Sequence, residues 1–280
     1  MRSFARRAQC QLGAEQGLGV RALIEAIVIA FAAAATASLC AYHLRKLRIA
    51  EFARHVTRGS QSQHEATLAL ARAIFSEVKR GRDPAFLLPL LASLGGSPPT
   101  ILKAGGCCSG VHRLFITALD TLGIRAAQVT VYRREDPAAA HCLAQVRTES
   151  ANMLIDVDYG VCLQHPDGGP IDLAGLRSGV RPAIHPFVFD RQASYADGRP
   201  ARAAGYPDRD YYRFDYHLSR TANWADTMLK RAVYAALLPI TRGRVDCLLL
   251  PAILEWPEVL LAAALCWASI LLLAARALTR

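Results

Sequence analysis

The sequence lacks the patterns that mark a metal centre, a disulfide-stapled domain or a nucleic-acid-binding domain. Its eight cysteines are scattered, and neither their spacing nor their neighbours resemble a zinc site. Half of them lie in or beside apolar runs, and the unpaired remainder is typical of a reduced domain. No basic and aromatic stripe accompanies the net charge of +10. We therefore expect no metal, no cofactor and no nucleic-acid partner, and a nucleic-acid binder would rest on charge alone.

Apolar residues are what the chain has in abundance. They make up 52% of its 280 residues, and the mean hydropathy is positive, which indicates membrane segments. Residues 22–44 contain one carboxylate, Glu25, and residues 257–275 are largely apolar between Trp256 and Arg276. Each run can cross about 30 Å of hydrocarbon as a helix. No strong cleavage site marks the first run as a signal peptide, so we expect two transmembrane helices in a multi-pass protein of a bacterial inner membrane.

The remaining segments divide by composition. Residues 1–21 form a short N-terminal tail, and residues 45–60 form a basic juxtamembrane segment. Residues 61–224 carry mixed helical and strand patterns typical of a folded domain. Residues 225–245 combine apolar side chains with Lys230 and Arg231, which predicts an amphipathic helix on an anionic membrane surface.

A pair of cysteines precedes the clearest helical pattern in the domain. After Gly105 and Gly106, apolar residues recur at helical spacing until Gly123, so the pattern predicts a helix that begins at about Cys108. A thiol at a helix start is expected to have a lowered pKa, which suits a nucleophile. The alternative interpretation is a small buried cysteine pair at the start of a core helix.

Strand-like runs that carry a histidine and two carboxylates follow this helix. His141 lies in the run 140–146, and Asp156 and Asp158 lie in the run 153–160. A thiolate needs a base, and the base needs a carboxylate that fixes its tautomer. In a regular strand both carboxylates share a face, so alternation leaves the choice between them open.

The motifs GGCCSGVHRLFITALDTLGIRAA, AAAHCLAQV and MLIDVDYG resemble, in order and spacing, the transglutaminase-like (papain-like) cysteine superfamily over roughly residues 61–224. The resemblance implies an α+β domain in which a cysteine-bearing helix packs on an antiparallel sheet, here between two transmembrane helices. The family spacing selects Cys108 over Cys107 as the nucleophile, His141 as the base, and Asp156 over Asp158 as its partner. Where the family carries an aromatic residue two positions after the histidine, this chain has Leu143.

The resemblance implies acyl transfer at an amide bond of a peptide or protein substrate, with either water or an amine as acceptor. Cys108 attacks the carbonyl, His141 protonates the leaving amine, and Asp156 orients the imidazole. The backbone N–H of Cys108 is one expected oxyanion donor. The departure at Leu143 favours a second hypothesis, a catalytically inactive domain that binds a partner peptide as a membrane-tethered scaffold. His112, four residues after Cys108, is interpreted as a polar helix residue without a role in catalysis.

Overall fold

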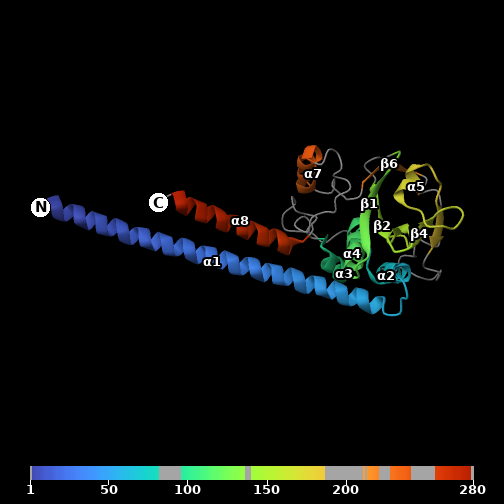
Figure 1. The fold of residues 1–280 in the computed structure, drawn as a ribbon, viewed down its shortest axis with the longest axis horizontal. Coiled ribbons are helices and arrows are strands. Elements are labelled where there is room, and N and C mark those ends of the chain that lie inside the picture. Colours follow the sequence, from blue (N-terminus) through green and yellow to red (C-terminus); the bar gives the residue numbers. More distant parts are fainter. Residues whose placement is uncertain are drawn as a thin grey trace. The chain divides into compact units, whose positions relative to one another are not determined.

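The computed structural model describes residues 2–81, 96–135, 140–186, 211, 213–220, 228–240 and 256–278 (Figure 1). The chain forms two compact units, one of Met1–Leu44 with Trp256–Arg280 and the other of Arg45–Glu255. The helix α1 spans Arg2–Val56 without a break, so the expected tail, anchor and most of the juxtamembrane segment are one continuous helix.

The first unit pairs α1 with α8, Pro257–Leu278, in antiparallel directions. Arg276 near the end of α8 contacts Glu25 of α1 at 2.7 Å, whereas Glu258 at its start accepts a hydrogen bond through its backbone oxygen from Ser38 at 2.8 Å. Among the described residues, the stretches Val20–Val56 and Pro257–Leu278 are each long and apolar enough to cross a membrane. Only 11% of the most apolar part of each stretch is buried within the protein, so most of it is exposed.

The second unit contains an antiparallel six-stranded sheet in the order β5-β4-β3-β2-β1-β6. Its strands are β1 Arg125–Arg133, β2 Ala140–Arg147, β3 Asn152–Asp156, β4 Val161–Gln164, β5 Ala183–Pro186 and β6 Phe214–Arg220. The first five strands are neighbours in chain order, and β6 returns to pair with β1 at the opposite edge. The expectation of an α+β fold with an antiparallel sheet is confirmed.

Helices precede and follow the strands. They are α2 Gln63–Glu77, α3 Pro98–Ala104, α4 Cys108–Thr121, α5 Leu173–Arg177 and α7 Met228–Ile240. The start of α2 is capped by Ser62, whose hydroxyl accepts from the Glu65 N–H, and the Glu65 carboxylate accepts from the Gln61 N–H in return. The helix α7 lies within the expected amphipathic segment, whereas residues 187–210, 221–227 and 241–255 lie outside the described residues.

The helix α4 packs against β1 and β2, and its apolar stripe is buried. It begins at Cys108, as the sequence predicts, and Gly123 follows its end with a positive φ of 74°. Strand residues also form an apolar cluster in which Val129 and Leu143 pack with aromatic residues. Tyr211, Phe214 and Tyr216 belong to that cluster, so these three aromatic side chains contribute to packing.

Candidate active site

The two cysteines lie where α4 begins. Cys107 is the residue that precedes the first helical turn, Cys108 is the first helical residue, and both are half-buried. The preceding backbone is fixed by an isolated bridge between Arg80 and Gly106. Gly105 has a φ of 84°, and a Cβ there would lie 2.4 Å from the Lys79 carbonyl oxygen, so only glycine fits this approach. The segment before α4 is therefore tied to the residues that follow α2.

His141 and Asp156 meet inside the domain. His141 is the second residue of β2, and Asp156 is the last residue of β3. The imidazole Nε2 donates to Asp156 Oδ2 at 2.6 Å, and neither side chain is more than marginally exposed. Because Nε2 bonds to the carboxylate, Nδ1 is the nitrogen left for the thiol of Cys108, with which His141 also hydrogen-bonds. The structure thus brings together Cys108, His141 and Asp156.

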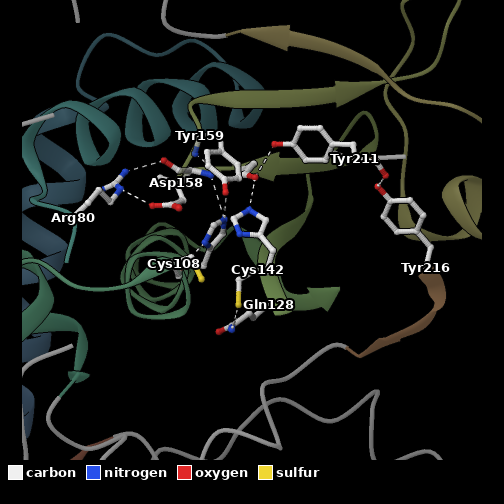
Figure 2. A network of polar contacts seen from close by, with 12 residues as sticks. Arg80, Cys108, Gln128, Cys142, Asp158, Tyr159, Tyr211 and Tyr216 are labelled. Carbon is white, nitrogen blue, oxygen red and sulfur yellow. Dashed lines mark hydrogen bonds and ion pairs between the residues drawn. The ribbon is translucent and has the colours of Figure 1, made fainter. Parts of the chain in front are cut away.

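The Asp156 carboxylate is fully buried and has three donors. Besides His141, the Tyr211 hydroxyl donates to Oδ2 at 2.7 Å and the Tyr159 backbone N–H donates to Oδ1 at 3.0 Å. Burial alone raises the pKa of Asp156, but the charge and hydrogen bond of His141 outweigh it and lower that pKa overall. Asp156 is therefore ionised, and Tyr211 is held in turn by the Tyr216 hydroxyl, which donates to its carbonyl at 2.8 Å (Figure 2).

The imidazole of His141 is packed by aromatic rings. It stacks on Tyr159 with ring centroids 4.6 Å apart and on Phe214 with centroids 5.9 Å apart. Burial lowers the pKa of His141, but the Asp156 carboxylate and the hydrogen bond with Cys108 raise it well above the ordinary value. The ring is therefore fixed in orientation and favours the imidazolium form.

The thiol of Cys108 differs from the sequence expectation. Its hydrogen bond with Cys107 lowers its pKa, but hydrogen bonding with Cys142 and burial raise it, and the net direction is upward. The expected lowering at a helix start is wrong, because that reasoning omitted both the burial of the sulfur and Cys142. The Cys142 thiol lies between Cys108 and the Gln128 amide, which donates to its sulfur at 3.1 Å (Figure 2).

Asp158 is held away from the imidazole. It lies in the turn after β3, where strand alternation does not apply, and it pairs with Arg80 Nε at 2.7 Å (Figure 2). The same guanidinium donates to the carbonyl of Val157 at 2.9 Å. Sequence reasoning missed Arg80 because a basic residue near the end of an amphipathic helix has no distinguishing local signal.

Two further side chains beside the candidate site were not assigned to it from the sequence. Tyr211 reaches Asp156 from just before β6, at a sequence separation of 55 residues. His112 is fully buried beside Asp156, whereas the sequence suggested an ordinary polar helix residue. In the described part of the chain, no three His, Cys, Asp or Glu side chains are arranged to hold a metal ion.

Comparisons with known proteins return only distant similarity of fold. No protein-family profile matches the sequence, and no curated protein matches it. One similar solved structure is a provisionally named cysteine protease of Cytophaga hutchinsonii, with 16% identity and a TM-score of 0.32 over 40% of this chain and 37% of that one. Another is a provisionally named protease of Parabacteroides distasonis, with 18% identity and a TM-score of 0.31 over 43% of this chain and 26% of that one.

These alignments span well under half of either solved chain. At TM-scores of 0.32 and 0.31 they establish neither the fold nor the activity of this chain. The roles of Cys108, His141 and Asp156 therefore stay predictions that depend on the geometry of this chain.

The His141–Asp156 pair should give the domain a defined pH dependence of stability. The lowered pKa of Asp156 contributes stability above its unfolded pKa of about 3.9, and the raised pKa of His141 contributes stability below its unfolded pKa of about 6.5. The substitution Asp156→Asn should therefore lower the free energy of unfolding by about 3 kcal/mol between about pH 4 and 6.5. The loss should shrink as pH rises through the raised pKa of His141, in urea unfolding of the detergent-solubilised chain.

Asp158→Asn is the matched control for this measurement. Its partner Arg80 keeps its charge at every accessible pH, so its loss of stability should persist where that of Asp156→Asn shrinks. A loss for Asp156→Asn that stays constant from pH 5 to about pH 10 would show that His141 is not its charge partner.

Proposed function

We propose that this protein is a membrane-anchored, transglutaminase-like cysteine enzyme that acts on amide bonds by thiol acyl transfer. The observation that carries the proposal is one imidazole that hydrogen-bonds both to a buried carboxylate and to a thiol at a helix start. Asp156, His141 and Cys108 then act as orienter, base and nucleophile. Because Nε2 is bound to Asp156, Nδ1 is left for the thiol, which supports these roles.

The chemistry follows from the hydrogen-bond directions. With Nε2–H donated to Asp156, the neutral form of His141 presents its Nδ1 lone pair and takes the proton of the Cys108 thiol; the raised pKa of His141 favours this transfer, because the imidazolium that results is the stabilised form of the ring. The sulfur attacks the amide carbonyl, the developing oxyanion faces the Cys108 backbone N–H at the first turn of α4, and His141 returns the proton to the leaving amine. A thioester on Cys108 remains, which either water or an amine resolves.

The substrate class we propose is a peptide or protein with an accessible amide. Water as acceptor gives a peptidase or amidase, and an amine gives a transamidase. The aromatic rings against His141 come from Tyr159 and Phe214, so the buried Leu143 does not leave the imidazole without ring contacts.

The raised pKa of Cys108 favours a second candidate function. A thiol that keeps its proton at neutral pH is a poor nucleophile, and it suits an inactive domain that binds a partner peptide as a membrane-tethered scaffold. The two functions differ in whether the reactivity of Cys108 depends on His141.

We further propose that α1 and α8 span the membrane and that the domain is cytoplasmic. The antiparallel pairing of α1 with α8 supports an arrangement of two spans with both chain ends on one side of the bilayer. Lys and Arg residues near the spans are divided almost evenly between the domain side and the side of the chain ends. The slight excess on the domain side favours a cytoplasmic domain. The basic segment with Lys230 and Arg231 and a set of free domain cysteines lean the same way.

A reporter fused after Arg280 and active on one side only tests this topology. Because two spans return the chain to its starting side, the reporter should be active outside the cytoplasm. Cytoplasmic activity would place the domain on the outer side and overturn the assignment.

Alkylation by iodoacetamide, read by mass spectrometry of peptide 104–113, distinguishes the enzyme from the scaffold. Wild-type Cys108 should react slowly at pH 6 and faster as pH rises, because its pKa is raised. His141→Gln should slow the reaction at pH 8 by about tenfold for each unit by which it raises the thiol pKa further. Asp156→Asn should slow it in the same direction, because the imidazolium loses its stabilising charge.

Asp158→Asn and Cys107→Ala are the controls. Asp158 pairs with Arg80 and Cys107 is not the proposed nucleophile, so the first should have little effect and the second should leave Cys108 reactive. An alkylation rate at Cys108 that neither His141→Gln nor Asp156→Asn changes would favour the scaffold. A faster reaction at Cys107 would show that the nucleophile is assigned to the wrong cysteine.

A further inference from the structure

A second histidine joins the two chain segments that hold the candidate nucleophile and its carboxylate. His112 lies one helical turn after Cys108 on α4 and has no exposed surface. Its Nδ1 is 2.8 Å from the Cys108 carbonyl oxygen, and its Nε2 is 3.2 Å from the backbone nitrogen of Val157. The ring thus bridges the first turn of α4 and the residue that follows Asp156.

The two partners fix the protonation of this ring. A carbonyl oxygen only accepts, so Nδ1 must carry a hydrogen, and a backbone N–H only donates, so Nε2 must offer its lone pair. The result is the neutral Nδ1–H tautomer with both nitrogens satisfied. Asp156 Oδ1 lies 3.9 Å from Nε2, which is too long for a hydrogen bond. Burial lowers the pKa of His112 and so keeps the ring neutral.

We infer that His112 is a positioning residue: it sets the separation between the Cys108 sulfur and the Asp156 carboxylate, and so the place of His141 between them. The inference rests on the proposed function. Asp156 is joined to its neighbour Val157 by one peptide bond, and Cys108 contributes the carbonyl that His112 binds, so a shift at either end reaches the imidazole of His141.

Protonation of His112 would break this bridge. A hydrogen on Nε2 would point at the Val157 N–H, and Asp156 Oδ1, at 3.9 Å, belongs to the carboxylate that already binds His141. The charged or titratable groups that face His112 are Asp156 at the end of β3, Asp158 in the turn after it, His141 of β2 at a ring distance of 6.3 Å, and Cys108 in the first turn of its own helix. Only the neutral ring is compatible with the hydrogen bonds observed.

The test measures Cys108 alkylation against pH in full-length protein in detergent micelles, with His112→Asn and His112→Gln. Asparagine can place an amide N–H near the Nδ1 position, and glutamine can place an amide oxygen near Nε2, so each variant can keep one end of the bridge. Both should weaken the Cys108–His141 contact and move the midpoint of the pH profile upward by about one unit, which is roughly a tenfold slower reaction at fixed pH.

Leu119→Ala is the matched control. Leu119 lies two turns further along the same face of α4 and is fully buried, so its truncation should lower the melting temperature but leave the pH profile unchanged. His112 variants with a lowered melting temperature and a wild-type profile would show a structural role only and overturn the inference.

Two results separate this inference from the proposed function. If His141→Gln also leaves the wild-type profile unchanged, the proposed function fails; if His141→Gln shifts the profile and both His112 variants do not, only the inference fails. For variants that do not fold, histidine ring ¹⁵N spectra of the wild type give a second test. They should show one histidine held as the neutral Nδ1–H tautomer, and an Nε2–H ring at His112 would overturn the inference.

Discussion

The complete burial of the Asp156 carboxylate is the constraint on which the centre of the domain depends. Asp156 would be destabilising at the end of β3 unless its oxygens were paired, and it is paired with an imidazole, a phenol and a backbone N–H. These contacts draw in β2, the residues before β6 and the turn after β3. The orientation of His141, and therefore its contact with Cys108, follows from the burial of this one charge.

Two sets of contacts outside the β-sheet connect the cysteine segment to the residues around Asp156. Arg80 pairs with Asp158 and binds the Val157 carbonyl, while its own backbone bridges to Gly106 just before the cysteines. His112 makes the corresponding link from within α4. Both links converge on the two residues after Asp156, so the short turn Val157–Asp158 is the joint between the helical and the strand parts of the site.

Much of this arrangement could be predicted from the sequence where the pattern is local. The start of α4 and the strands around His141 and Asp156 follow from apolar periodicity and from turn residues. The choice between Asp156 and Asp158 could not be derived from alternation, because β3 ends at Asp156 and the period of two stops there. It came from the spacing of the family motif alone.

The rest depends on contacts distant in sequence or on burial. Arg80 and Tyr211 reach the Asp156 region across 77 and 55 residues, and no local pattern signals such contacts. The direction of the Cys108 pKa was predicted wrongly because a helix start was weighed without the desolvation of the sulfur and without Cys142 on the neighbouring strand. Burial of His112 likewise depends on the packing of α4 against the sheet.

Acylation of the protein by an activated ester is the measurement that tests the central claim most directly. Full-length protein in detergent is incubated with p-nitrophenyl acetate at mildly alkaline pH, and the acetyl adduct is located within peptide 104–113 by fragment masses. The account predicts a hydroxylamine-sensitive thioester on Cys108 that forms quickly in the wild type and slowly in His141→Gln. An adduct on Cys107, or one on Cys108 that forms equally fast without the imidazole, would contradict it.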